Sequence, residues 1–79
     1  MGCRVIAFAQ AREWLGFSER EVEVLPQETG RGLVSALLRE RSRELPPTWK
    51  LALDEQWVGW DAPIGTAREI AVMPPFSGG

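Results

Sequence analysis

The chain has 79 residues, 44% of them hydrophobic and 25% charged, which is the composition of one small folded domain with too little interior for a large substrate cavity. Its net charge is −2 and its basic residues alternate with acidic ones, as in residues 39–44, which argues against nucleic acid as the main partner. The single cysteine excludes an internal disulfide, and the lack of histidine excludes the usual soft-metal sites. No apolar run approaches the roughly 20 residues of a membrane span, which excludes a transmembrane helix. We therefore expect a cytoplasmic protein.

The first half of the chain predicts a strand, a short helix, a second strand and a longer helix. Residues 4–9 are apolar and partly β-branched, which favours a strand, and residues 10–15 are good helix formers followed by the stop signal Gly16. Residues 21–24 alternate polar and apolar, which is typical of a strand with one wet face. Thr29 is positioned to cap a helix that begins near residue 30. The apolar stripe of this helix comprises Leu33, Val34, Leu37 and Leu38.

The second half predicts three more strands. Proline at 46 and 47 ends the helical region, and strands follow over residues 49–53 and 56–60, joined by a tight turn at 54–55. Residues 69–73 form the last strand, which Pro74 stops. The whole chain, 1–79, is therefore expected to be a single α+β domain of ubiquitin-like β-grasp type. It should have a mixed sheet of four to five strands, one main helix across one face, and a flexible C-terminal tail over residues 74–79.

Strand alternation assigns the apolar side chains to the two faces of the sheet. The face packed against the helix is predicted to contain Val5, Ala7, Val22, Val24, Val58, Ile70 and Val72. The opposite face is predicted to contain Ile6, Phe8, Trp57, Ala71 and Met73. Apolar side chains that no element covers often mark an interface, so this second set is a candidate partner surface.

The residue types do not favour an enzyme. A nucleophile paired with a base usually needs histidine or a perturbed lysine, and the chain has no histidine and one lysine. The end of the sequence is the candidate reactive element instead, because Gly78 and Gly79 can enter a channel too narrow for any other residue. Once the Gly79 carboxylate is joined to AMP, a sulfur or amine nucleophile can displace the AMP, and the protein itself needs no catalytic side chain.

Three segments of the sequence resemble the MoaD/ThiS family, in particular the small sulfur-carrier subunit of molybdopterin synthase. Residues 5–13 are similar to the family's first strand and turn, and residues 53–58, followed by Asp61 and Pro63, to its hairpin. Residues 73–79 resemble its Pro-Pro-x-x-Gly-Gly tail. The chain departs from the family pattern in two turns, at residues 67–70 and at Asp54, where many relatives have Asn.

The resemblance implies a β-grasp fold and a non-enzymatic sulfur donor. It implies that an E1-like adenylating enzyme activates Gly79, with Gly78 beside it, using ATP and magnesium. A sulfurtransferase then supplies sulfur to give a C-terminal thiocarboxylate, which the large subunit of molybdopterin synthase uses to make molybdopterin for the molybdenum cofactor. No cofactor or metal is expected to be bound by the chain itself. The partner-binding residues that carry over by position are Phe8, Arg12, Trp57, Met73, Pro74, Pro75, Phe76 and Ser77.

The sequence leaves three alternatives open. In the first, the carrier serves thiamine thiazole, cysteine or another sulfur-containing product, since one fold hosts several pathways. The same activated glycine would also suit a ubiquitin-like protein modifier. A plain β-grasp binding module would have no tail chemistry, and loss of Gly79 would then be harmless.

Overall fold

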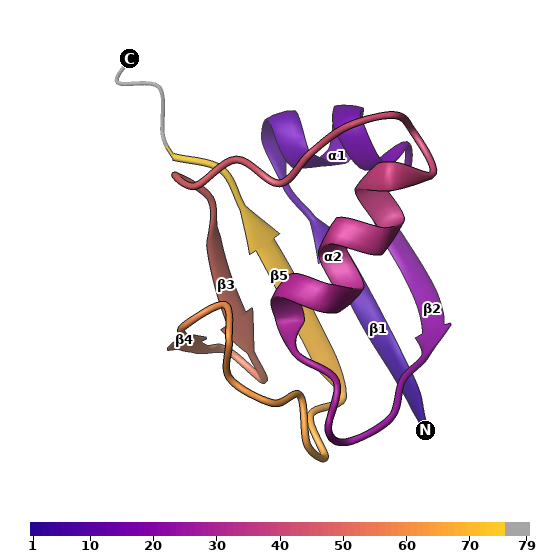
Figure 1. Ribbon diagram of the computed structural model, residues 1–79, viewed down its shortest axis with the longest axis vertical. Coiled ribbons are helices and arrows are strands. Elements are labelled where there is room, and N and C mark those ends of the chain that lie inside the picture. Colours follow the sequence, from indigo (N-terminus) through magenta and orange to yellow (C-terminus); the bar gives the residue numbers. More distant parts are fainter. Residues whose placement is uncertain (76–79) are drawn as a thin grey trace.

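The computed structural model describes residues 1–75 and contains a five-stranded sheet with two helices (Figure 1). The strand order is β2-β1-β5-β3-β4, with β1 and β5 parallel and the other neighbours antiparallel. This confirms the predicted mixed sheet. The elements are β1 (Gly2–Ala7), α1 (Ala9–Leu15), β2 (Glu19–Glu23), α2 (Gly30–Arg39), β3 (Lys50–Leu53), β4 (Gln56–Val58) and β5 (Glu69–Met73).

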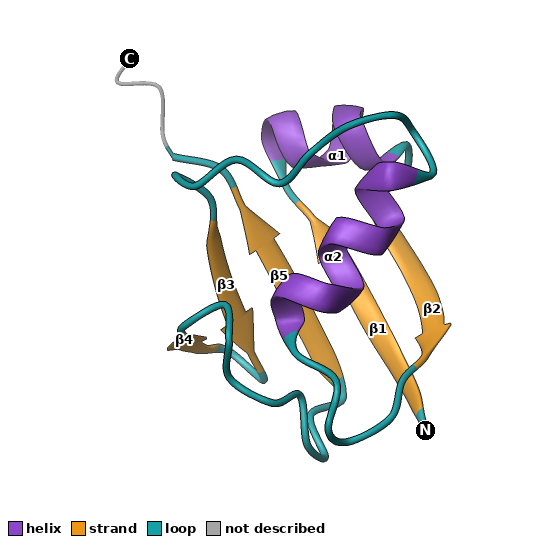
Figure 2. Cartoon of the chain, in the orientation of Figure 1, coloured by secondary structure: helices purple, strands orange, loops and turns teal. Residues whose placement is uncertain are grey.

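The helix α2 crosses one face of the sheet, and α1 lies at the end where β1 stops and β5 leads into the tail (Figure 2). The predicted apolar stripe of α2 is buried against the sheet. The hydroxyl of Thr29 accepts a hydrogen bond from the Gly32 amide at 3.0 Å, so Thr29 is the predicted N-cap. A Cβ atom at Gly30 would overlap a methyl group of Leu51, so any larger residue at the start of α2 would require the buried Leu51 side chain to shift.

The core lies between α2 and the sheet. Val5 and Val72 of the central strands are fully buried, as is Ile70, and Leu51 of β3 extends the same layer. The predicted core residues Val22 and Val58 are only half-buried, because each lies on an edge strand where one side has no neighbour to cover it.

The turn between β3 and β4 forms without glycine. Asp54 and Glu55 have φ values of +48° and +69°, and the two strands pair directly on either side of them. Positive φ at both central residues is the geometry of a type I′ hairpin turn. The carboxylate of Asp54 accepts hydrogen bonds from the amides of Arg68 at 2.9 Å and Glu69 at 3.0 Å, which compensates for the strain by tying the turn to β5.

Several predicted strand boundaries differ from the structure by one or two residues, and two of these differences have identifiable reasons. The first strand ends at Ala7 rather than residue 9, because Ala9 has φ +49° and begins α1. The strand predicted over 56–60 ends at Val58. Beyond it, the indole of Trp60 donates a hydrogen bond to the carbonyl of Trp49 at 2.7 Å instead of continuing the strand.

Candidate functional site

The face of the sheet that α2 leaves uncovered, called the open face here, carries a row of side chains that crosses four strands. Ile6 of β1 pairs with Ala71 of β5, Ala71 with Ala52 of β3, and Ala52 with Trp57 of β4. Because strand neighbours in register point to the same side, these four side chains share the open face. The row therefore places small residues in the middle and large ones at both ends.

The two alanines in this row form a low apolar floor. Ala71 is 6% exposed and Ala52 is 4% exposed, although neither lies under α2, since their short side chains sit between larger neighbours. The flanking Trp57 is 62% exposed and Phe8 is 46% exposed, which are high values for large aromatic side chains. Sequence alternation predicted the side of Ala71 correctly, but the side chain is covered and cannot provide much contact area.

The predicted tail begins directly beside this floor. Met73, the last residue of β5, pairs with Lys50 at the start of β3 and is half-buried. Pro74 is also half-buried and Pro75 is exposed, and neither has an amide hydrogen with which to continue the sheet. The other four predicted tail residues lie outside the described residues; they are Phe76, Ser77, Gly78 and Gly79.

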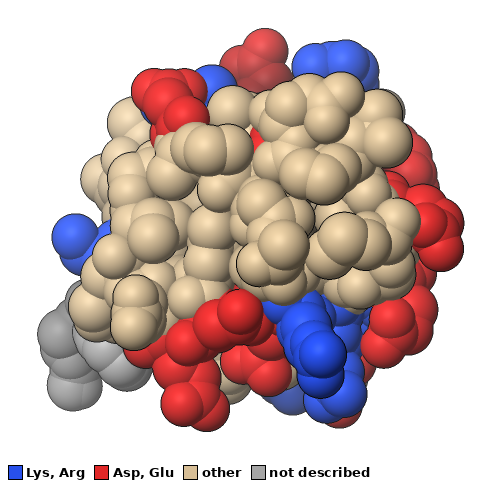
Figure 3. Space-filling view, turned by 90° about the horizontal axis from the view of Figure 1, so that it is seen from below, with Lys and Arg blue, Asp and Glu red and all other residues tan. Residues whose placement is uncertain are grey.

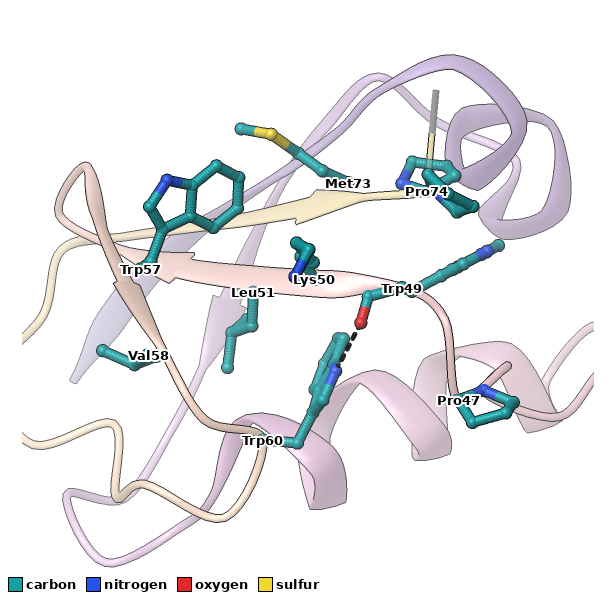
Figure 4. A pocket seen from close by; sticks show the side chains of 10 residues that line it. Pro47, Trp49, Lys50, Leu51, Trp57, Val58, Trp60, Met73 and Pro74 are labelled. Carbon is teal, nitrogen blue, oxygen red and sulfur yellow. Dashed lines mark hydrogen bonds between the residues drawn. The ribbon is translucent and has the colours of Figure 1, made fainter. Parts of the chain in front are cut away.

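A groove of ≈ 840 Å³ runs along the outer edge of β3 and reaches the start of the tail (Figure 4). The side chains of Trp57 and Met73 lie on one side of β3 and that of Trp60 on the other, so the groove extends around the edge of the sheet. It is lined by Pro47, Trp49, Lys50, Leu51, Trp57, Val58, Trp60, Met73, Pro74 and Pro75.

Lys50 is a groove residue that the sequence reasoning did not select. Its position was nevertheless available from the pattern, because Lys50 alternates with the buried residues Trp49 and Leu51. Alternation places it on the open face with Ala52. A charged residue in an otherwise apolar alternating set was the signal that the prediction overlooked.

Arg12 lies apart from the row but at the same end of the molecule. It is exposed on α1, which contacts β1 and β5 near the point where the tail begins. The structure thus brings the predicted residues Phe8, Trp57 and Met73 to the open face, with Phe8, Met73 and Pro74 at the end where the tail begins and Arg12 on the adjacent helix.

The chemistry of the described residues offers neither a reactive thiol nor a metal cluster. Cys3 is buried on the helix-covered side, and burial, reinforced by the nearby Asp54 charge, raises the pKa of its thiol. Within residues 1–75 there is no group of three or more His, Cys, Asp or Glu side chains that could hold a metal ion. No helix in that part of the chain is long and apolar enough to cross a membrane.

A second uncharged surface lies at the end of the molecule remote from the start of the tail. Figure 3 shows this end as a broad area without charged side chains, bordered by acidic and basic groups. Met1 and Leu25 are exposed, and the backbone of Met1 is hydrogen bonded to that of Val24, the residue before Leu25. Met1 precedes β1 and Leu25 follows β2, so both lie at the opposite end of the sheet from Met73 and Pro74.

Comparison with known proteins gives both a family and a fold. A model of the ThiS family matches residues 5–79, which is nearly the whole chain. The chain superposes on SAMP1 from Haloferax volcanii with a TM-score of 0.77 at 20% identity, covering 100% of both chains.

Two further solved structures agree. A putative molybdopterin converting factor, subunit 1, from Pyrococcus furiosus gives a TM-score of 0.73 at 21% identity, covering 95% of this chain and 98% of that one. The solution structure of small archaeal modifier protein 1 from Methanosarcina acetivorans gives a TM-score of 0.72 at 18% identity, covering 99% of this chain and 96% of that one. At these identities the likeness establishes the fold, which is the predicted ubiquitin-like β-grasp.

Proposed function

This chain belongs to the ThiS family, and we propose from this that it is a sulfur carrier whose reactive group is the carboxylate of Gly79. The observation that carries the proposal is the extent of the family match, which runs through residue 79 and so includes Gly78-Gly79. In this role the protein is a substrate and sulfur donor rather than a catalyst.

The proposed chemistry takes place in two stages. An oxygen of the Gly79 carboxylate attacks the α-phosphorus of ATP on an E1-like adenylating enzyme, which releases pyrophosphate and leaves an acyl adenylate. A sulfur nucleophile supplied by a sulfurtransferase then displaces AMP. If that nucleophile is a persulfide, a thiol must reduce the resulting acyl disulfide to yield the thiocarboxylate. Magnesium and ATP belong to the activating enzyme in this scheme.

The arrangement of the described residues supports this role. The tail begins at Pro74, beside the open face that carries Phe8 and Trp57. A partner that binds these side chains is thereby positioned to receive the tail. Pro74 and Pro75 prevent the residues that follow from adding to the sheet, which favours presentation of the glycines to another protein.

For the acceptor, we propose the large subunit of molybdopterin synthase, and hence a role in making the molybdenum cofactor. The support is the similarity of residues 5–13 and 73–79 to the small subunit of that enzyme. A protein named molybdopterin converting factor, subunit 1, also has this fold. Adding the large subunit and cyclic pyranopterin monophosphate to the thiocarboxylated protein tests this step, and failure to form molybdopterin would redirect the search to other acceptors.

The decisive experiment is the intact mass of the protein incubated with its own organism's adenylating enzyme, magnesium-ATP and a persulfide source. We expect the mass change for replacement of one oxygen by sulfur, and complete loss of that change when Gly79 is deleted. Gly59→Ala is a matched control, because no atom lies within 4 Å of a Cβ built there. An unchanged wild-type mass, with the enzyme active on another carrier, would exclude the sulfur carrier.

A second candidate function is attachment to lysines of other proteins. It is favoured by the fold shared with two proteins named as small archaeal modifiers. Both functions need an activated Gly79, so the deletion does not separate them. Conjugates that survive a denaturing gel and depend on ATP and Gly79 would establish modification.

A further inference from the structure

The open face carries two basic side chains, and only one of them forms an ion pair among residues 1–75. Arg4 lies 3.5 Å from a carboxylate oxygen of Glu19 and 3.8 Å from one of Glu21. Lys50, the one lysine of the sequence, takes part in none of the ion pairs found among residues 1–75. The charge of Arg4 is thus balanced within the protein, whereas that of Lys50 is left to solvent or to a partner.

The surroundings of Lys50 are apolar and adjoin the start of the tail. Its backbone pairs with Met73, the residue before Pro74. Its side chain lines the same groove as Trp57, Met73 and the tail prolines, and no acidic residue lines that groove (Figure 4). An exposed ammonium group therefore stands within the apolar surface that a partner must cover to reach the tail.

We propose, on the premise of the function proposed above, that Lys50 is the ion-pairing point of this surface and that the adenylating enzyme presents a carboxylate to it. Docking on Trp57 and Met73 removes water from around the ammonium group. A charge that loses its water without gaining a counter-charge weakens binding strongly, whereas a paired one also fixes the register of the complex. The partner's carboxylate supplies the counter-charge for Lys50, as Glu19 and Glu21 do for Arg4.

A carboxylate fits this position better than a phosphate group. Phosphate sites in proteins combine several donors, such as arginine forks or successive backbone amides. Lys50 is the single charged residue that lines the groove, and the walls beside it are indole, proline and thioether groups. One point charge between apolar walls matches one acidic side chain of a protein partner.

The experiment is titration of the full-length protein with its own organism's adenylating enzyme by calorimetry, at low and at physiological salt. We expect Lys50→Glu to weaken binding by more than about tenfold and Lys50→Arg to stay within roughly twofold of wild type. The matched control is Arg39→Glu, which makes the same change in net charge. Arg39 is exposed at the end of α2, on the other side of the sheet, and has no ion pair among residues 1–75.

The outcomes separate this inference from the proposed function. If wild type is adenylated and Lys50→Glu binds equally well, the role of Lys50 is overturned and the carrier function stands. If Arg39→Glu weakens binding as much as Lys50→Glu, overall charge explains the effect and the specific ion pair is again overturned. If wild type is neither bound nor adenylated, the proposed function fails and this inference with it.

Discussion

The two faces of the sheet differ in how completely their apolar side chains are used by the fold. Under α2, the side chains of Val5, Ile70 and Val72 are fully buried. On the open face, Trp57 is 62% exposed and Phe8 is 46% exposed, although both are larger than any of those three. The apolar side chains of one face are therefore buried in the core and stabilise the fold, whereas the open face keeps exposed apolar area that is available for binding a second protein.

This difference explains how so small a domain can support a function. A chain of 79 residues has room for one core, and helix α2 supplies the cover for it. Binding groups must then be placed outside the core, where their loss affects the fold little. Substitutions on the face that α2 covers should lower the free energy of unfolding, and substitutions on the open face should weaken partner binding.

The largest effect is expected from Ile70→Ala, which leaves a cavity between α2 and the sheet. We expect the free energy of unfolding to fall by about 3–5 kcal/mol, compared with about 1 kcal/mol for Ile6→Ala on the half-buried open face. Urea denaturation of both variants measures the two values. Equal losses would show that the open face contributes as much to the fold as the covered face does, which would contradict the division proposed here.

The covered side could largely be predicted from the sequence because its signals are periodic. Alternation in the strands and the stripe at Leu33, Val34 and Leu37 identify which side chains point inward. Burial at the sheet edges could not be predicted in this way. Val22 and Val58 obey the alternation, but the strand order, which leaves β2 and β4 as edges, is a property of the whole chain.

The candidate site was only partly predictable for a related reason. Phe8, Trp57 and Met73 followed from alternation, and Gly78 and Gly79 followed from their lack of side chains and then from the resemblance to the family. Lys50 was overlooked although alternation places it on the open face. Its position beside Met73 and the place of Trp60 in the groove could not be predicted, because they depend on tertiary contacts, namely the pairing of Lys50 with Met73 and the hydrogen bond from Trp60 to the Trp49 carbonyl. A pattern read along one strand does not contain such contacts.

The next largest effect is expected from Trp57→Ala, measured on binding rather than on folding. Loss of this exposed indole should weaken binding of the adenylating enzyme by about 2 kcal/mol, because large aromatic side chains dominate interfaces, and should change the free energy of unfolding by less than about 1 kcal/mol. Leu25→Ala is the control, since Leu25 is 56% exposed but lies at the end remote from the tail. A similar loss of binding in Leu25→Ala would mean that exposure alone, and not position on the open face, decides partner contact.

The smallest effect concerns an ion pair outside both faces, between Arg31 at the start of α2 and Asp61 in the segment after β4. The guanidinium Nε and Nη2 of Arg31 lie 2.8 Å and 3.2 Å from the two carboxylate oxygens, and this hydrogen bonding, with the charge of Arg31, lowers the pKa of Asp61. A carboxyl group whose pKa is lowered in the folded state stabilises the protein at pH values above its unfolded-state pKa of about 3.9. That stabilisation is lost as the pH falls through the folded-state pKa.

We therefore expect Asp61→Asn to reduce the free energy of unfolding at neutral pH, and the difference from wild type to shrink as the pH falls below the unfolded-state pKa and through the lowered folded-state pKa, as followed by chemical denaturation from neutral to acidic pH. The difference should also shrink in high salt, because both groups are exposed. Glu55→Gln, which removes an exposed carboxylate with no hydrogen bond or ion pair among residues 1–75, should show no such trend. A pH-independent loss in Asp61→Asn would mean that Asp61 acts through the packing of its loop. The stability supplied by the covered side would then extend beyond the apolar layer under α2 to the loop after β4.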